Sequence, residues 1–207
     1  DGAFGQFSFV MPEHDAVLAL TSGTSDMNGV MNNVWQHVLP ALRSAALPPN
    51  AAAHARLQTK LGSLALPVQA GQGRSERAAA VSGRTYTCDE NELGIRSARL
   101  DFEPEGALLQ IDDADGQHRI ACGAGRWLRA RTSFQRGISN QFSAPEQGIA
   151  ASGAWTEADV FTAKLCFHES PYTLTGRFTF AGKELFIDFE HNLRWGETKR
   201  PRITGRS

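Results

Sequence analysis

The strongest constraint on this chain is an alternation of apolar and polar residues that begins at Gly83 and continues to Gly205. Phe178 and Phe180, for example, flank Thr179. Because successive side chains of a β-strand point to opposite faces, period-two alternation predicts strands with one apolar face and one polar face. A sheet of this kind must curve around a core to bury its apolar face. The sequence therefore predicts a mainly β architecture for this region.

Turn-forming residues divide the alternating region into short segments. Glu103-Pro104-Glu105-Gly106 and Asp112 to Gly116 are the clearest turns, and residues 137–147 are expected to form a loop. Short strands at near-regular spacing are typical of an antiparallel up-and-down barrel or a sandwich. The expected strands cover residues 83–88, 98–102, 108–111, 118–122, 127–131, 149–155, 160–167, 172–180, 184–189 and 202–205.

The first part of the chain has a different pattern. Two β-rich runs, 7–11 and 16–20, flank the turn-forming residues 12–15 and predict a hairpin. Residues 28–42 repeat apolar side chains at helical spacing and predict a helix capped by Ser25 or Asp26. A hairpin and one helix are too small to hold a core of their own, so we expect a partner layer elsewhere.

The middle of the chain predicts a short helix over 51–61, capped by Asn50, and then a linker over 67–82 that is rich in Gly, Gln, Ser and Ala. The predicted domains are therefore 1–47, a hairpin and helix; 48–82, a short helix and linker; and 83–207, an antiparallel β-barrel. Strand-like sequence follows Asp1 at once, and we expect a piece of a longer protein or a product of proteolysis, while a removed signal peptide stays open.

The opening segments GAFGQFSFVMPEHDAVLALTSG and GVMNNVWQHVLPAL resemble the C-terminal end of the serine β-lactamase and penicillin-binding-protein fold, in its class C and esterase branch. The remainder, from about Leu57 on, resembles the lipocalin-like β domain that some bacterial members carry, through SGRTYTCDENELGI, Gly-Ala-Trp and HESPYTLTGRFTF. The resemblance implies that Gly2, Phe4 and Gly5 belong to the active-site wall of a parent hydrolase. It further implies that residues 1–47 are the remnant of that α/β domain, and that the barrel is an accessory domain.

The catalytic groups of that family are absent from this sequence. The residues three positions before the four lysines are Leu57, Phe161, Phe180 and Gly196, so the chain has no Ser-x-x-Lys motif. Lys-Thr-Gly is absent as well. We therefore expect no catalytic residues here, and no β-lactamase or esterase activity from this chain alone, although the parent would be a serine hydrolase.

The expected partners follow from the same interpretation. They are the missing catalytic domain and, through the exposed N-terminal hairpin, a second copy of the chain. A net charge of −1 gives no strong field for nucleic acid, and no apolar run approaches the ~20 residues that span a bilayer. The resemblance implies a bacterial protein, and both periplasm and cytoplasm stay open.

The remaining candidate sites are weak. Arg126, Arg129, Arg131 and Arg136 cluster around Trp127, and predict either a solvated strand edge or a contact for an anion or another domain. The histidines have no metal-ligand spacing, so no metal and no cofactor are expected. The cysteines at 88, 122 and 166 are interpreted as small buried hydrophobes, with a disulfide plus a free thiol as the alternative.

An alternative function belongs to another class of protein. The apolar stripes over 163–167 and 174–180 are compatible with a lipocalin-like binding module that holds a small apolar ligand inside the barrel. The competing interpretation is a barrel whose interior is filled by its own Phe and Leu side chains, as is usual in small barrels.

Overall fold

The computed structural model describes residues 1–134 and 146–207. The chain divides into two compact units, Asp1–Pro67 and Val68–Ser207, and each is described by itself. The three domains predicted from the sequence stay a prediction. Most of the predicted loop at 137–147 lies outside the described residues. Arg136 lies wholly outside them.

The first unit contains the predicted hairpin and helices. Strands β1 and β2 pair antiparallel, with Phe7 opposite Leu20 and Met11 opposite Ala16. The elements are β1 (Phe7–Met11), η1 (Pro12–His14), β2 (Ala16–Leu20), α1 (Met27–Asn33), η2 (Val34–Val38), η3 (Leu39–Ala41) and α2 (Ala51–Gly62). In the described part of the chain these two strands form a sheet of their own, so both edges of the hairpin are without a third strand.

The predicted helix over 28–42 is present but is not a uniform α-helix. Its N-terminus is capped by Asp26, whose carboxylate accepts a hydrogen bond from the Gly29 N–H at 2.8 Å. After Asn33 the helix widens into the π-helical turn η2 and ends in the tighter turn η3. Pro40 lies in η3, and because proline has no N–H it cannot continue the regular hydrogen-bond ladder.

The core of the first unit is small. Phe4, Phe7, Met11 and Val34 are its buried apolar side chains. Val10 is 69% exposed on the other face of the hairpin. Pairing of this hairpin with a second copy stays a prediction.

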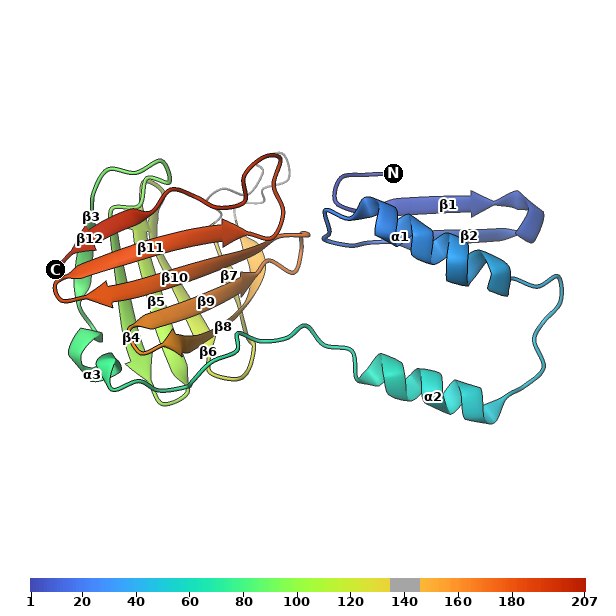
Figure 1. Ribbon diagram of the computed structural model, residues 1–207, viewed down its shortest axis with the longest axis horizontal. Coiled ribbons are helices and arrows are strands. Elements are labelled where there is room, and N and C mark those ends of the chain that lie inside the picture. Colours follow the sequence, from blue (N-terminus) through green and yellow to red (C-terminus); the bar gives the residue numbers. More distant parts are fainter. Residues whose placement is uncertain (135–145) are drawn as a thin grey trace. The chain divides into compact units, whose positions relative to one another are not determined.

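The second unit is an antiparallel barrel, and its strands follow the predicted ones closely (Figure 1). The elements are α3 (Arg77–Val81), β3 (Thr85–Cys88), β4 (Ser97–Glu103), β5 (Gly106–Asp113), β6 (Gly116–Gly123), β7 (Leu128–Thr132), β8 (Gln147–Glu157), β9 (Val160–Cys166), β10 (Thr173–Ala181), β11 (Glu184–His191) and β12 (Ile203–Arg206). The prediction of a mainly β chain with an antiparallel barrel is confirmed.

The sheet of this unit closes on itself. Its ten strands run in the order β6-β5-β4-β3-β12-β11-β10-β9-β8-β7. The ring is completed where Gly123 of β6 pairs with Ser152 of β8. Strand β7 pairs with the first half of β8, from Gln147 to Ala151. This single pair brings the two ends of the strand order together.

The two ends of the barrel are different. The β4–β5, β8–β9 and β10–β11 turns lie at the end beside α3, which we call the α3 end. The β9–β10 and β11–β12 connections and the β5–β6 turn lie at the other end, which we call the loop end. These positions follow from the antiparallel direction of neighbouring strands.

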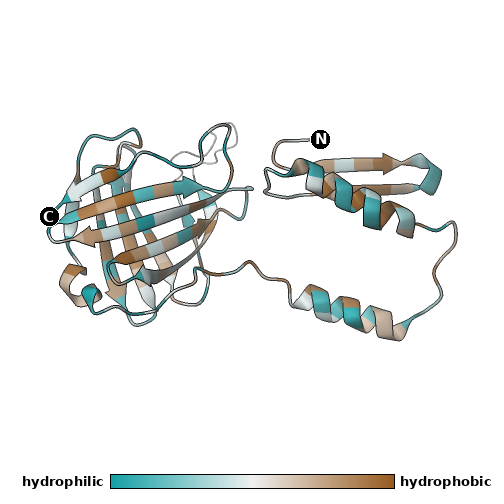
Figure 2. Ribbon diagram, viewed as in Figure 1, coloured by the Kyte–Doolittle hydropathy of each residue, from teal (hydrophilic) through white to brown (hydrophobic). Residues whose placement is uncertain are grey.

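Inward-facing side chains fill much of the barrel. Along β10, Leu174, Phe178 and Phe180 are buried while Arg177 is exposed, as the alternation predicts. Figure 2 shows this alternation of apolar and polar residues along the barrel strands. The largest fully buried side chains of the core are Tyr86, Phe134, Phe167, Phe178, Phe180, Ile95, Leu100, Leu109, Ile111, Ile120, Ile149 and Leu165.

Residues 68–76, which we call the strap, run along the outside of β8. The N–H of Gln72 donates to the Trp155 carbonyl at 2.8 Å, and the Trp155 N–H donates back to Gln72 at 2.8 Å. The N–H of Gln69 donates to Ser152 Oγ at 2.9 Å. Strand β8 thus pairs with β9 along one edge, and with β7 and then Gln72 of the strap along the other; its residues from Gln147 to Trp155 are all buried.

The segment expected to be a linker thus packs against the barrel. After the strap it forms α3, where Val81 is 1% exposed and belongs to the core. Its small residues allow this close packing, since a Cβ on Gly71 would lie 2.5 Å from the Trp155 carbonyl oxygen. No helix in the described residues is long and apolar enough to cross a bilayer.

The β4–β5 turn gives a test of the packing. Gly106 has φ +151°, and a Cβ there would lie 2.0 Å from the backbone oxygen of Cys122. We expect Gly106→Ala to lower the free energy of unfolding by about 3 kcal/mol, because backbone must move in addition to the strained φ.

Gly116→Ala is the matched control for this substitution. Gly116 has φ +127° and open space at the Cβ position, so its cost should be about 1 kcal/mol from the backbone alone. Urea unfolding of the two variants measures the difference. Equal losses would show that the contact with Cys122 is not tight.

Candidate functional site

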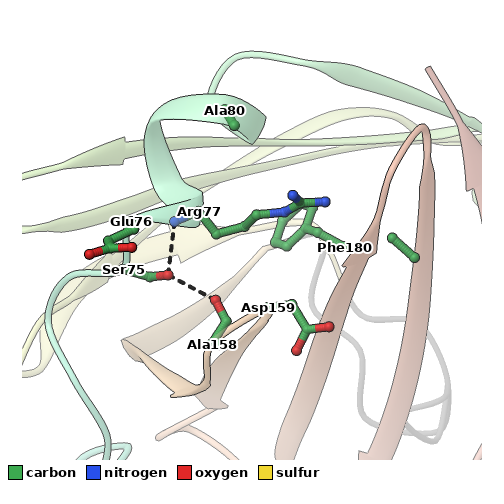
Figure 3. A pocket seen from close by; sticks show the side chains of 8 residues that line it. Ser75, Glu76, Arg77, Ala80, Ala158, Asp159 and Phe180 are labelled. Atoms are coloured by element: carbon green, nitrogen blue, oxygen red, sulfur yellow. Dashed lines mark hydrogen bonds between the residues drawn. The ribbon is translucent and has the colours of Figure 1, made fainter.

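A hollow of about 750 Å³ lies at the α3 end of the barrel. Its lining residues come from the start of α3, the β8–β9 turn and the end of β10 (Figure 3). They are Ser75, Glu76, Arg77, Ala80, Ala158, Asp159, Phe180 and Ala181. Pockets that hold small molecules usually have volumes of several hundred cubic ångströms, so this hollow is large enough for one.

Hydrogen bonds of Ser75 hold the two sides of the hollow together. Its Oγ donates to the Ala158 carbonyl at 2.8 Å and accepts from the Arg77 N–H at 3.1 Å (Figure 3). These bonds fix the strap to the β8–β9 turn and set the direction in which α3 begins. Figure 3 shows Arg77 extending across the hollow from α3, and Asp159 pointing into it from the turn.

Phe180 connects the hollow to the interior of the barrel. Its ring centroid lies 5.8 Å from that of Trp155, 6.0 Å from Tyr86 and 6.1 Å from Phe102. Phe102 packs in turn on Phe161, with centroids 5.1 Å apart. The hollow therefore has an aromatic floor, and this end of the interior is occupied by the protein's own rings.

Two buried polar atoms near this floor lack a protein partner. Neither Arg77 Nε nor the Tyr86 hydroxyl has a hydrogen-bond partner in the described structure. Burial raises the pKa of Tyr86, and the positive charges of Arg84 and Arg77 act in the opposite direction. Because an unsatisfied buried polar group is costly, these atoms are suited to an acceptor supplied by water or by a ligand.

A second hollow of about 400 Å³ lies on the other side of the strap residues. It shares Ser75, Glu76 and Ala158 with the first, and Trp155 also lines it. Trp155 is 3% exposed, so its fluorescence should respond to changes in either hollow.

The sequence did not identify this site. Arg77 and Ala80 lie in the segment 67–82 that was expected to be a linker. The run Ser75 to Val81, with small apolar residues after two charges, was the available signal for a short helix. Phe180 was predicted to face the core, and it does.

Gly2, Phe4 and Gly5 form a bend in the first unit. The Gly2 N–H donates to the Gln6 carbonyl at 2.7 Å, and Ser22 Oγ donates to the carbonyls of Phe4 and Gly5 at 3.1 and 2.7 Å. Phe4 and Gly5 have positive φ values of 63° and 87°. The structure gives these residues a role in closing the hairpin on itself.

The three arginines Arg126, Arg129 and Arg131 do not converge on one point. Arg126 pairs with Glu105, and Arg131 pairs with Glu169 at 3.1 Å. The Gly148 N–H and then Arg131 lower the pKa of Glu169. Carboxylates thus engage two of the three guanidinium groups, and an anion or interdomain site at these residues stays a prediction.

The cysteines are free thiols in the structure. Burial raises the pKa of Cys122 to about 12 and that of Cys88 to about 11, so neither is a reactive thiolate at neutral pH. Among the described residues, no group of three or more His, Cys, Asp or Glu side chains is placed to hold a metal ion.

His191 is a second unusual polar residue, at the loop end. It is the last residue of β11 and is 2% exposed. Within the described residues, neither ring nitrogen has a hydrogen-bond partner. Burial, and then the nearby charge of Arg194, lowers the pKa of His191 to about 4.

No family model and no curated protein matches this chain. Among solved structures, it is similar to the fatty-acid-binding protein of Drosophila melanogaster brain, with 11% identity, a TM-score of 0.43, and coverage of 60% of this chain and 98% of that one. The fatty-acid-binding protein of Manduca sexta has 8% identity, a TM-score of 0.44 and coverage of 61% and 99%. A secretory abundant heat-soluble protein of Ramazzottius varieornatus has 12% identity, a TM-score of 0.39 and coverage of 54% and 70%.

The expected membership of the β-lactamase and penicillin-binding-protein group is wrong. The similar structures are β-barrels, and nothing in the comparisons points to a β-lactamase or a penicillin-binding protein. The interpretation of residues 1–47 as a hydrolase remnant is therefore unsupported. An active-site role of Gly2, Phe4 and Gly5 is not tested here, and a bacterial origin is not shown. A hairpin followed by a helix is a common local arrangement, and its order alone did not identify a family.

His191 predicts a dependence of stability on pH. An unfolded histidine takes up a proton near pH 6.5, whereas folded His191 does so only near pH 4. As pH falls through this window the unfolded state gains a proton first, so stability is lost, by about 3 kcal/mol in full. Well above pH 6.5 His191 is neutral in both the folded and the unfolded protein, so its contribution to the free energy of unfolding no longer changes with pH.

We therefore expect His191→Gln to reduce the difference in unfolding free energy between pH 7 and pH 4.5 by about 2 kcal/mol. Urea unfolding at both pH values measures this difference. His14→Gln, at an exposed position, serves as the control and should keep the wild-type difference. An unchanged difference in His191→Gln would contradict the prediction.

Proposed function

We propose that the barrel unit binds a small, mainly apolar ligand at its α3 end. The observation that carries this proposal is the hollow of about 750 Å³ above the buried ring of Phe180. Small-molecule sites combine apolar walls with a few directed polar groups. Here Ala80, Ala158 and Phe180 supply apolar surface, and Arg77 supplies the directed polar group.

The ligand should carry an acceptor group, preferably an anionic one. The guanidinium group of Arg77, which extends across the hollow in Figure 3, can only donate hydrogen bonds. The carboxylates of Glu76 and Asp159 at the rim would disfavour an anion elsewhere in the hollow, so its position beside Arg77 is well defined. A charge-assisted hydrogen bond contributes about 1.5–3 kcal/mol.

The filled part of the interior limits where the ligand lies. Phe102, Trp155, Phe161 and Phe180 occupy the space beneath the hollow. We place the ligand above these rings, at the mouth of the barrel. This differs from the alternative drawn from the sequence, which put an apolar ligand within the barrel.

Two fluorescent probes test the proposal. Anilinonaphthalene sulfonate has an apolar body and an anionic group, and phenylnaphthylamine has a similar body without the charge. We expect Arg77→Gln to weaken binding of the sulfonate about tenfold and to leave binding of the uncharged probe nearly unchanged. Arg77→Lys should lose less affinity for the sulfonate, because lysine keeps the positive charge.

A second pair of variants tests the position of the ligand. In Ala80→Trp the larger side chain should fill the hollow, and both probes should bind more weakly. Ala121→Trp, at an exposed position on β6, is the matched control and should bind both probes as the wild type does. Wild-type affinity of Ala80→Trp for both probes would place their binding elsewhere and overturn the proposal.

A further inference from the structure

Three polar side chains at the loop end form a continuous hydrogen-bonded chain. His118 Nε2 lies 3.0 Å from Asp113 Oδ1, and His118 Nδ1 lies 3.0 Å from Ser133 Oγ. The side chains of Asp113 and His118 are each 1% exposed. Ser133, in contrast, is an exposed residue. A buried acid, a buried imidazole and an accessible hydroxyl are thus connected in series.

The β5–β6 hairpin brings the acid and the imidazole together. Ile111 pairs with His118 across the hairpin, and Asp113 lies two residues beyond Ile111 on the same face. The Asp115 N–H donates to Asp113 Oδ1 at 2.8 Å and fixes the carboxylate. His118 also packs against Phe134, with ring centroids 5.4 Å apart. The imidazole is therefore held in place by contacts on several sides.

The direction of the hydrogen bonds follows from the chemistry of the three groups. A carboxylate only accepts, so His118 Nε2 must carry the proton that is donated to Asp113. In the neutral ring this leaves Nδ1 with a lone pair, which accepts the hydrogen bond from the Ser133 hydroxyl. The imidazole is thus in the tautomer that can remove the hydroxyl proton.

We propose that Ser133 is a nucleophile, activated by His118, that takes an acyl group from small activated esters. Ser133 Oγ attacks the carbonyl carbon and passes its proton to His118 Nδ1. A new C–O bond to Ser133 forms, the bond to the leaving alcohol breaks, and the proton departs with that alcohol. Asp113 stabilises the imidazolium that forms in between.

The hydrogen-bonded series of Asp113, His118 and Ser133 differs in one respect from the usual Ser-His-Asp arrangement. In chymotrypsin-type enzymes the serine contacts Nε2 and the acid contacts Nδ1, whereas here the two nitrogens exchange these roles. The order of donors and acceptors is the same, so the proton can follow the same route. The proposal requires acylation of Ser133 and does not require rapid turnover.

If the three hydrogen-bonded side chains had a purely structural role, a different result would be expected. If Ser133 only satisfied the buried imidazole, its hydroxyl would react no faster than that of any other exposed serine. Ser44 is such a serine: it is exposed, and it belongs to the first unit. The reactivity of Ser133 relative to Ser44 therefore separates the two roles within the wild-type protein.

The test uses p-nitrophenyl acetate and the full chain. We expect a burst of about one nitrophenolate per protein and an acetyl group that peptide mass spectrometry locates on Ser133. Ser133→Ala should abolish the burst, while Ser44→Ala should retain it. Asp113→Asn should slow acetylation by at least about tenfold, because the imidazolium loses its counter-charge.

Several outcomes would overturn the proposal. They are acetylation of Ser133 at the rate of Ser44, an unchanged burst in Ser133→Ala, or an unchanged rate in a folded Asp113→Asn protein. If Asp113→Asn does not fold, as near-ultraviolet circular dichroism would show, the comparison of Ser133 with Ser44 still decides the question. The reaction mixture contains no ligand of the α3 end, which keeps this result independent of the proposed ligand site.

Discussion

The barrel depends on the pairing of β6 with β8, where Gly123 lies opposite Ser152. Small residues make this approach of strands possible. A Cβ on Gly153 of β8 would lie 3.1 Å from the Cβ of Cys122 on β6. Without this contact the described sheet would be open, with β6 at one edge and β7 at the other. Closure is also what gives the unit two distinct ends.

Each candidate site belongs to one of these ends. The strap is hydrogen-bonded to β8 through Trp155, and it carries Ser75 and Arg77 to the mouth of the barrel. At the loop end, the β5–β6 hairpin holds Asp113 against His118. The two sites have different chemistry, because aromatic rings pack beneath the hollow at the α3 end, whereas the loop end holds the hydrogen-bonded side chains of Asp113 and His118.

Local sequence patterns predicted the strands well. Alternation placed Leu174, Phe178 and Phe180 on the inner face, and the Asp112 to Gly116 turn connects β5 to β6 as expected. These predictions succeed because a strand buries one face, and this produces an alternation of apolar and polar residues that can be recognised within a short stretch of sequence. The helix of the first unit was also predicted, although its π-helical turn was not.

Contacts between distant residues could not be predicted in the same way. The strap looked like a linker because Gly71 and its small neighbours favour flexibility, and only Trp155, more than eighty positions later, gives them a binding surface. The connection of Asp113, His118 and Ser133 joins three separate strands or strand ends, with no spacing motif to mark it. The family resemblance failed for a related reason, since it rested on the order of a few local elements.

The position of β12 in the sheet has a consequence for synthesis of the protein. Residues 203–206 lie between β3 and β11, so the first barrel strand has no neighbour on one side until these four residues are available. On the ribosome, β3 to β11 must therefore emerge as an incomplete sheet with both free edges exposed. The barrel can therefore close only after its last strand in chain order, β12, has left the exit tunnel.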